Sequence, residues 1–505
     1  MRSRKVKIVT WLILVGALVL RVYKLDWGNG YFFHPDENNM AWGINRLGAG
    51  NWNPHFFAYG QFPLYLGYLT IRLLGWDNGM AQAVMVLRGW SVVWSVLTVW
   101  GIMKLTQSLT ENSRLSLVAG LLACFVPGLI QMAHFGTTES LLTLVMVMSA
   151  WAGVEIYKGH NRAFWWGAII VGVGLAAKIS AVVAIMPIWL GSVAVFIDKK
   201  IAWQKLIVFN IVGGVVALIL FVLLSPYNLI AWGDFWRTIR YEVEVASGKI
   251  PVFYTQQFAD TAKYWFQIQK IWPYVVGIPM FVGMITGGII LAKQRRNLSM
   301  WLVALVPSLL YWFYFGQTFC KWTRFLTPII WWAPVLSTLL VARFDKYWQR
   351  GLVILAMVVP GVWFWTNLYF LPDVRVEATN WMVENIPLGS AILAESGNVV
   401  DLPLKGDFRV TNINFFDLDR NPQIASDLRL ALSEADFVIV PSRRVFMNYG
   451  RPEFPLVEKY YDQLEEDFIL IKAFERRTDL LLDPEKAEET WTVFDQPKIR
   501  IYQRI

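Results

Sequence analysis

The chain has 505 residues, of which 56% are hydrophobic and 16% charged, and its mean hydropathy is +0.42. This composition excludes an ordinary soluble globular protein and indicates a polytopic membrane protein. The net charge of +9 does not indicate nucleic-acid binding, because the basic residues lie at the ends of many apolar segments and form no single basic patch.

Apolar segments long enough to cross a bilayer, about 20 residues each, recur along most of the chain. We expect about eleven transmembrane helices, at 6–25, 83–106, 115–132, 137–157, 163–180, 181–197, 205–225, 273–292, 299–317, 324–342 and 351–371. No small-residue cleavage site follows the first segment, so it is expected to be an uncleaved signal anchor.

The distribution of Lys and Arg predicts the orientation of these helices. Basic residues gather at alternate ends, among them Lys5, Lys7, Lys104, Arg114, Lys158, Arg162, Lys199, Lys200, Arg295, Arg296, Arg343 and Lys346. The positive-inside rule places those ends and the N-terminus in the cytoplasm. The loops 26–82, 132–139, 226–272 and 316–323, and everything after residue 372, are then expected to be extracytoplasmic.

We divide the chain into a transmembrane domain, 1–372, and an extracytoplasmic soluble domain, 373–505. Helices are predicted in the second part at 377–385, 422–433 and 454–467, and strands at 390–395, 408–413, 436–441, 468–474 and 498–503. This alternation predicts a small α/β domain with a Rossmann-like sheet. It has no glycine-rich phosphate loop and no His, so we expect a packing, acceptor-docking or partner-binding role there and no catalytic centre.

The sequence His34-Pro35-Asp36-Glu37 places two adjacent carboxylates in the expected first outer loop, just outside the first apolar segment. Ionisable groups at a membrane rim usually face water, a cation or a substrate. Other charged residues are expected at the same depth, near the outer helix ends: Arg88, His134, Glu139, Lys178, Lys321 and Arg324. Taken singly, each has an ordinary explanation, such as a solvated loop residue or a snorkelling side chain. Taken together, they suit a reaction on a lipid-borne phosphate.

Such a set predicts a definite chemistry. A carboxylate can accept a proton from a hydroxyl or amine that attacks the anomeric carbon of a sugar. Arg and Lys side chains can hold the lipid phosphate and stabilise its negative charge as it leaves. His34 and His134 are also available to a divalent cation, although their spacing matches no known ligand pattern.

Several motifs resemble those of the GT-C glycosyltransferases, in the branch of the protein O-mannosyltransferases and the lipid A aminoarabinose transferases. They are Arg21 at the end of the first span, the His-Pro-Asp-Glu sequence, Gln61-Phe62-Pro63-Leu64-Tyr65, Arg88, and Phe135-Gly136-Thr137-Thr138-Glu139-Ser140. The resemblance covers about the whole membrane half. It implies a bacterial inner-membrane enzyme and a polyprenyl-phosphate monosaccharide as the donor.

The resemblance also implies roles for individual residues. Asp36 corresponds to the catalytic base, with Glu37 beside it, and Glu139 stands where relatives often have Asp, in a metal or acceptor contact. Arg88, Lys178, Lys321 and Arg324 are the candidates for binding the donor phosphate. The acceptor is left open between a protein, a lipid and a cell-envelope glycan, and membrane lipids are expected partners.

Two alternatives remain at this stage. A transporter or flippase would also have many spans and a few buried charges, but such proteins usually show internal repeats, and no such symmetry is visible here. A structural subunit could use residues 373–505 to recruit an envelope partner; replacing Asp36 by alanine would then leave function intact.

Overall fold

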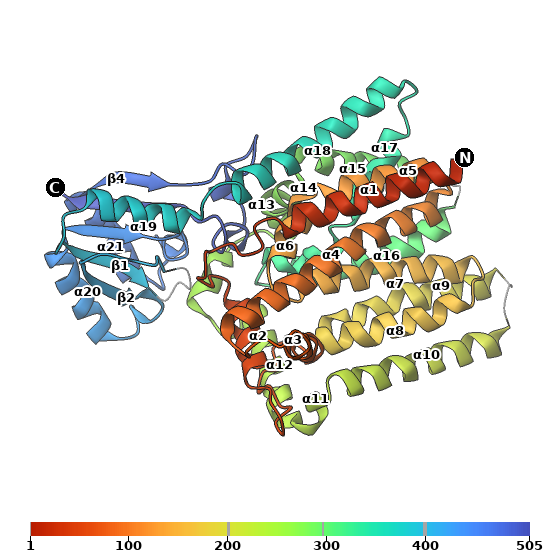
Figure 1. Cartoon of the computed structure of the whole chain (residues 1–505), viewed down its shortest axis with the longest axis horizontal. Helices are drawn as coiled ribbons and strands as arrows, with labels where there is room; N and C mark the ends of the chain where they lie inside the picture. Colours follow the sequence, from red (N-terminus) through yellow and green to blue (C-terminus); the bar gives the residue numbers. More distant parts are fainter. Residues whose placement is uncertain (1, 199–201, 295–296, 397–400) are drawn as a thin grey trace.

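The computed structural model describes residues 2–198, 202–294, 297–396 and 401–505. Four of the basic residues used to predict orientation, Lys199, Lys200, Arg295 and Arg296, lie outside the described residues. A bundle of long helices is followed by a small sheet with its own helices, which lies at one end of the bundle (Figure 1).

Most of the chain up to residue 369 is helical. The helices are α1 (Arg2–Val22), α2 (Pro35–Asn45), α3 (Phe62–Leu73), α4 (Met80–Thr110), α5 (Ser113–Cys124), α6 (Pro127–His134), α7 (Glu139–Tyr157), α8 (Arg162–Ala177), η1 (Ile179–Ala184), α9 (Ile185–Ile197), α10 (Trp203–Leu224), α11 (Tyr227–Ile230), α12 (Trp232–Ala246), η2 (Phe253–Phe258), α13 (Trp265–Lys270), α14 (Trp272–Val276), α15 (Ile278–Lys293), α16 (Leu298–Gln317), η3 (Thr323–Phe325), η4 (Thr327–Ile329), α17 (Trp332–Val341) and α18 (Tyr347–Tyr369).

Within the described residues, six helical segments are long and apolar enough to cross a membrane, or up to nine if each of three bent helix pairs counts as one span. The bent pairs are α5 with α6, α13–α14 with α15, and η3–η4 with α17. The expected segments at 6–25 and 163–180 correspond to α1 and to the shorter apolar helix α8. The chain is thus a multi-pass helical membrane protein, and the number of eleven spans stays a prediction.

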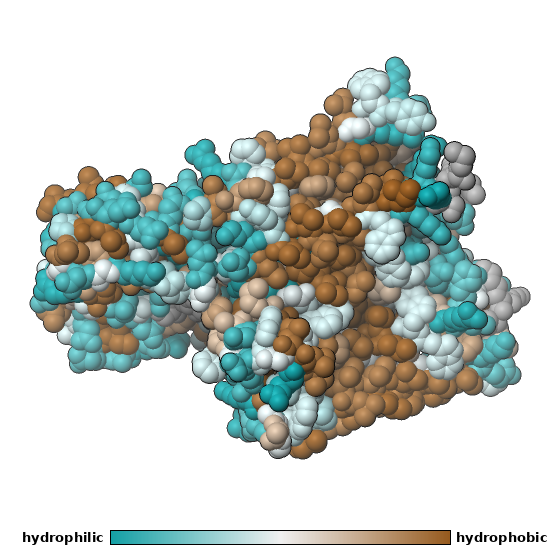
Figure 2. Space-filling view, in the orientation of Figure 1, coloured by the Kyte–Doolittle hydropathy of each residue, from teal (hydrophilic) through white to brown (hydrophobic). Residues whose placement is uncertain are grey.

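The outer surface of the bundle is apolar, as a bilayer requires. Figure 2 shows a broad hydrophobic surface over the long helices, bordered by hydrophilic side chains at both ends. Of the residues of α10, all of which are described, only Ala217 is buried, while Leu223 is 67% exposed. So much exposed apolar surface is stable only against lipid or another apolar partner.

The short helices α2, α3, α11 and α12 gather at the end of the bundle that carries the sheet (Figure 1). Helix α2 starts with Pro35, whose fixed φ suits a first helical position, and Asp36 and Glu37 lie in its first turn. Carboxylates are favoured there by the helix dipole. Both acids therefore lie at the start of one helix, and they pair with different arginines, Asp36 with Arg324 and Glu37 with Arg88.

The sheet has five strands in the described part of the chain, in the order β2-β1-β3-β5-β4. The strands are β1 (Ala391–Ser396), β2 (Arg409–Asn414), β3 (Phe437–Val440), β4 (Phe468–Phe474) and β5 (Ile499–Arg504), and the helices are α19 (Val374–Asn385), α20 (Pro422–Glu434) and α21 (Pro455–Asp467). Helix α19 packs on one face of the sheet, and α20 and α21 pack on the other. The predicted α/β layer is therefore present.

The direction of the strands differs across the sheet. Strand β1 pairs in parallel with β2 and β3, as in a Rossmann-like unit, whereas β5 is antiparallel to both β3 and β4. The long segment between β4 and β5 leaves the sheet and returns to the bundle, where Trp491 stacks on Phe364 of α18 with ring centroids 5.4 Å apart. This returning segment, residues 484–497, joins the sheet to the neighbouring end of the helix bundle.

Candidate active site

The first carboxylate of the pair, Asp36, forms an ion pair with Arg324. Arg324 Nη1 donates to Asp36 Oδ2 at 2.5 Å, and both side chains stay partly accessible, 27% for Arg324 and 22% for Asp36. The arginine comes from η3, 288 residues away in sequence. Its guanidinium also lies over the ring of Trp322, 4.4 Å from the centroid. The predicted base and one predicted phosphate ligand therefore meet.

A second ion pair lies beside the first. Lys178 Nζ donates to Glu139 Oε1 at 2.9 Å, with Glu139 in the first turn of α7 and Lys178 between α8 and η1. Tyr59 links the two pairs, because Lys178 Nζ is 4.9 Å from the centre of its ring and Arg324 Nη1 is 3.5 Å from its hydroxyl oxygen. We call Asp36, Tyr59, Glu139, Lys178 and Arg324 the outer charge cluster.

The position of Tyr59 depends on close backbone packing. Gly60 donates its N–H to the carbonyl oxygen of Ala177 at 2.9 Å, and a Cβ at Gly60 would lie 2.0 Å from the carbonyl oxygen of Ala176. Only glycine allows the loop to approach this closely. The next residue, Gln61, donates to Asn228 Oδ1 at 2.8 Å, which fixes the loop from its other side.

The electrostatic surroundings of Asp36 favour its ionised form. Burial raises the pKa of this carboxyl group, but Arg324, with help from His34, Tyr59 and Lys178, outweighs burial and lowers the pKa to about 2. Asp36 is therefore an anion at neutral pH, held by a cation that is still accessible from outside. A ligand that draws Arg324 away would return the pKa of Asp36 toward its usual range.

The second carboxylate, Glu37, has different surroundings. Arg88 donates to it through Nε at 2.8 Å and Nη2 at 2.7 Å, and the backbone N–H of Gly136 donates to it at 2.8 Å. Arg88 also donates to the carbonyl oxygens of Leu25 and Trp27. Glu37 is 0% exposed and Arg88 is 1% exposed. The structure therefore separates Arg88 from the other predicted phosphate ligands and ties it to the predicted second acid.

Lys321 and the two candidate metal-binding histidines form neither of the cluster's two ion pairs. Lys321 Nζ donates to Thr261 Oγ1 and to the Phe319 carbonyl oxygen, both at 3.0 Å. His134 stacks on Tyr369, and its ring nitrogens lie 2.9 and 3.0 Å from the carbonyl oxygens of Ile130 and Tyr23. His34 packs between Phe135 and Phe494.

These surroundings bear on whether the site could hold a divalent cation. Among the described residues, no three His, Cys, Asp or Glu side chains converge as metal ligands. The carboxylates of the outer charge cluster each already bind a cationic side chain, Arg324 or Lys178. This donor set does not fit a divalent metal ion, so no step of the chemistry is assigned to one.

Sequence reasoning missed a third acid near the cluster, Glu242 on α12. Its carboxylate is close enough to Arg324, Asp36 and Lys178 for their charges to act on it, although burial has the largest effect and raises its pKa. The end of α12 is held against the segment before Arg324, because the N–H of Cys320 donates to the Ala246 carbonyl oxygen at 3.0 Å. An acid on an amphipathic loop helix is too common for the sequence to single it out.

Glu488, in the returning segment 484–497, was also missed as a contact of the site. Its Oε2 accepts from Thr323 N at 2.9 Å and from Thr323 Oγ1 at 2.8 Å, and its own N–H donates to the Lys270 carbonyl oxygen. Thr323 begins the short helix η3 that presents Arg324. The C-terminal part of the chain therefore holds the turn that carries the arginine.

Comparison with known proteins identifies the fold. Residues 80–226 match the family model described as dolichyl-phosphate-mannose-protein mannosyltransferase. The archaeal oligosaccharyltransferase AglB from Archaeoglobus fulgidus, in complex with an inhibitory peptide and a dolichol-phosphate, superposes with a TM-score of 0.55 over 91% of this chain and 72% of its own, at 13% identity. ArnT from Cupriavidus metallidurans in the apo state superposes with a TM-score of 0.50 over 76% of this chain and 69% of its own, at 16% identity.

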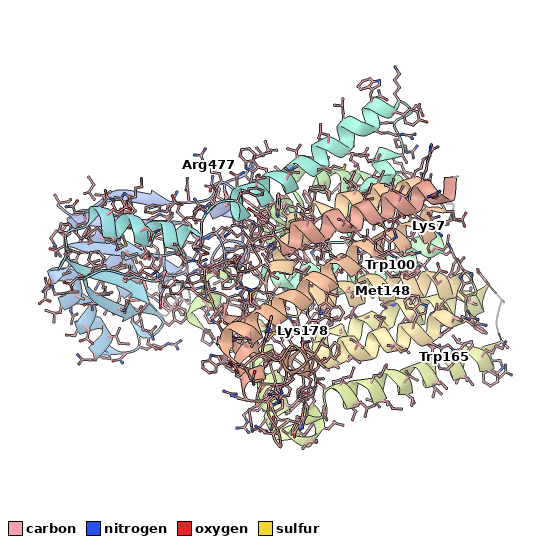
Figure 3. The ribbon with its side chains drawn as sticks, viewed as in Figure 1. Lys7, Trp100, Met148, Trp165, Lys178 and Arg477 are labelled. Carbon is pink, nitrogen blue, oxygen red and sulfur yellow. The ribbon has the colours of Figure 1, made fainter. Side chains whose placement is uncertain are left out.

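The chain has the GT-C glycosyltransferase fold. The expected fold class is thereby confirmed, including the small C-terminal sheet. No sequence among the curated proteins matches the chain. The fold brings the segment that follows α1, the start of α7 and the turn η3 together at one end of the bundle. Lys178 lies at this end, far from Lys7 at the other (Figure 3).

Proposed function

We propose that this protein is a membrane glycosyltransferase that moves a monosaccharide from a polyprenyl-phosphate carrier to an extracytoplasmic acceptor. The observation that carries the proposal is the accessible Asp36–Arg324 ion pair beside Lys178 and Glu139. It combines a carboxylate base with two cations suited to a phosphate. The positive-inside rule puts this end of the bundle outside the cytoplasm, which we take to be the outer face of a bacterial inner membrane.

The donor phosphate would take over the cations of the cluster. Arg324 presents N–H groups in a planar fork that matches phosphate oxygens, and Lys178 adds a second positive charge on the other side of Tyr59. The structurally similar AglB is described in complex with a dolichol-phosphate, which supports a lipid phosphate as the kind of ligand. Nucleotide sugars are cytoplasmic, so the predicted orientation disfavours them.

Transfer then follows from an exchange of partners. When the phosphate binds Arg324, Asp36 loses its counter-ion and its pKa rises toward the usual range, which makes it a stronger base. Asp36 accepts the proton of the acceptor hydroxyl or amine as that atom bonds to the anomeric carbon. The bond between the anomeric carbon and the phosphate oxygen breaks, and the electron pair leaves with the phosphate, stabilised by Arg324 and Lys178.

The other predicted site residues take supporting roles in this proposal. Glu37 and Arg88 hold the first outer loop on α4 and the Gly136 turn, so they stabilise the fold and take no part in the transfer step. Glu139 orients Lys178. Glu242 faces the same charges from α12 and is suited to an acceptor contact. His34 and His134 act as packing residues, and Lys321 positions its own loop.

The proposal is tested by supplying purified protein with a panel of radiolabelled polyprenyl-phosphate hexoses and pentoses, and in parallel with the matching nucleotide sugars. Envelope lipid, glycan and membrane-protein fractions serve as acceptors. We expect transfer from at least one lipid-linked donor and none from nucleotide sugars. Transport of the labelled lipid across vesicles without transfer would favour the transporter alternative and contradict the proposal.

A further inference from the structure

A cavity of about 250 Å³ lies between α1, α4 and α5. It is at the end of the bundle opposite the sheet, where Figure 3 marks Lys7, so it is separate from the outer charge cluster. The orientation predicted from the basic residues places this end in the cytoplasm. None of the roles proposed above uses it.

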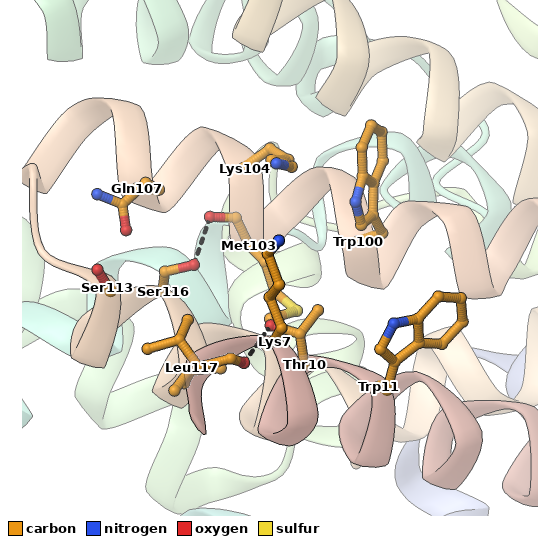
Figure 4. A pocket seen from close by; sticks show the side chains of 11 residues that line it. Lys7, Thr10, Trp11, Trp100, Met103, Lys104, Gln107, Ser113, Ser116 and Leu117 are labelled. Carbon is orange, nitrogen blue, oxygen red and sulfur yellow. Dashed lines mark hydrogen bonds between the residues drawn. The ribbon is translucent and has the colours of Figure 1, made fainter. Parts of the chain in front are cut away.

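The polar side chains of the cavity are cationic or neutral. Lys7 from α1 and Lys104 from α4 extend into the same space from facing helices (Figure 4). Gln107 and Ser113 add further polar groups, and no carboxylate is among the lining residues. Among the described residues neither lysine has an ion-pair partner, and Lys104 Nζ lies 5.5 Å from the centre of the Trp100 ring. Two uncompensated ammonium groups at one cavity favour an anion.

Two other hydroxyl groups of the cavity already donate to the backbone. Ser116 Oγ donates to the Met103 carbonyl oxygen at 2.7 Å, and Thr10 Oγ1 donates to the Val6 carbonyl oxygen at 2.9 Å. These bonds fix the shape of the wall but leave the lysines as the principal donors. An anion with several acceptor oxygens, such as a phosphate group, suits two separate ammonium donors.

The surface next to the cavity is apolar. Trp11, which lines the cavity, is 68% exposed, and the neighbouring Leu12 of α1 is 65% exposed. An indole ring at such a position lies at the level of lipid headgroups. A ligand whose charged group enters the cavity would therefore have its hydrocarbon part against the exposed face of α1.

We propose that this cavity binds the phosphate headgroup of an anionic phospholipid in the leaflet opposite the active site. Lys7 and Lys104 bind the phosphate oxygens, Gln107 and Ser113 contact the polar part of the headgroup, and the acyl chains lie along Trp11 and Leu12. Basic pockets between transmembrane helices on the cytoplasmic side are a known way of binding such headgroups. The lipid would join α1, which contributes Arg21 to the bundle core, to α4, which carries Arg88.

The test is a lipid titration of the purified full-length protein in a neutral detergent, read as the increase in thermal unfolding temperature. The probes are phosphatidylglycerol, phosphatidylcholine with the same chains, and soluble glycerol phosphate. The variant is Lys7→Gln with Lys104→Gln. The matched control is Arg343→Gln with Lys346→Gln, which removes two exposed positive charges near the same end of the bundle, outside the cavity.

We expect phosphatidylglycerol to stabilise the wild type and the control more than phosphatidylcholine does, and the double lysine variant to bind it about thirtyfold more weakly. Lys7→Arg with Lys104→Arg should retain binding, which separates loss of charge from misfolding. Equal losses of phosphatidylglycerol binding in the double lysine variant and the control would overturn the site, because they would indicate a general attraction of the lipid to positive charges on the protein surface. Stabilisation by glycerol phosphate as large as that by the lipid would overturn the lipid as its ligand.

Discussion

Asp36 and Glu37 are neighbours in sequence, yet the regions around them differ in exposure and in the number of hydrogen bonds. Asp36 binds one arginine through one oxygen and is 22% exposed. Glu37 binds Arg88 through both oxygens, accepts a backbone N–H as well, and is 0% exposed. Both are carboxylate–arginine pairs at the start of α2.

The difference shows how one helix turn serves two purposes. A fully buried and fully hydrogen-bonded pair cannot exchange partners without leaving a buried charge unpaired, which is costly. A partly exposed pair with one bond can release its arginine to an incoming anion. We therefore assign a stabilising role to the Glu37–Arg88 pair and a catalytic role to Asp36 with Arg324.

The largest expected effect is that of Asp36→Asn on transfer. Loss of a general base typically lowers the rate by about two to four orders of magnitude. The amide keeps the size of the side chain, so the unfolding temperature should stay near that of the wild type. Initial rates at saturating donor measure the effect, with Asp26→Asn, an exposed acid in the same loop, as the control. Wild-type rates in Asp36→Asn would remove Asp36 from the base role.

Glu37→Gln tests the buried Glu37–Arg88 pair and should lower the stability of the protein. It leaves the buried guanidinium of Arg88 without its anion, so we expect a loss of about 3–5 kcal/mol in the free energy of unfolding. Replacing both partners by Glu37→Leu and Arg88→Met should cost less than the single change, because no charge then remains buried. Thermal or denaturant unfolding in detergent makes the comparison. A Glu37→Gln protein as stable as the wild type would contradict the stabilising role of the buried Glu37–Arg88 pair.

Glu488 tests whether the accessible pair depends on support from the C-terminal part. Glu488→Ala removes the acceptor of Thr323 N and Oγ1, so Arg324 should lose its position and donor KM should rise. We expect a coupling of about 0.5–3 kcal/mol with Arg324→Ala in transfer efficiency. Gln131→Met breaks a neighbouring contact, that with Asp495, and serves as the control. If Glu488 acts through Arg324, Glu488→Ala should have no further effect on transfer when Arg324 is already alanine, whereas Gln131→Met should keep its effect. Additive effects of Glu488→Ala and Arg324→Ala would contradict this role.

Glu395 in β1 extends the comparison to a buried carboxylate with no cationic partner at hydrogen-bonding distance among the described residues. Burial raises its pKa to about 8, against the hydrogen bond donated by Tyr461. The folded protein then keeps a proton that the unfolded chain loses above its usual carboxyl pKa. Stability should therefore fall as pH rises from about 5 to 8, by at most about 1.4 kcal/mol per pH unit. Glu395→Gln should reduce this pH dependence of the unfolding temperature, whereas the control Glu384→Gln, at an exposed position, should not. A pH dependence as steep in Glu395→Gln as in the wild type would contradict the raised pKa of Glu395.

Much of the fold could be predicted because it follows from local patterns. The apolar segments at 83–106, 137–157, 205–225 and 299–317 match α4, α7, α10 and α16 to within a few residues. The strands and helices of residues 373–505 begin and end within a few residues of their predicted bounds. The antiparallel pairing of β5 was not predicted, because alternation of apolar residues does not reveal the direction of a neighbouring strand. The boundary at residue 372 and the topology stay predictions.

The candidate site could be predicted only in part. Hydropathy gives the depth of a charged residue along a helix, so Asp36, Glu139, Lys178 and Arg324 were expected near one another. It does not give the side of the helix that the residue faces, so the pairing of Arg88 with Glu37 and the separation of Lys321 were not foreseen. Contacts over hundreds of residues, such as that between Glu488 and Thr323, leave no local signal.

The most direct test measures Asp36→Asn and Glu37→Gln side by side, as transfer rate per folded molecule and as unfolding temperature in the same preparations. The account predicts that Asp36→Asn unfolds like the wild type and transfers at least a hundredfold more slowly. It predicts that Glu37→Gln unfolds at a lower temperature and that its remaining folded molecules transfer at nearly the wild-type rate. A stable Glu37→Gln protein without activity, together with an active Asp36→Asn protein, would contradict it.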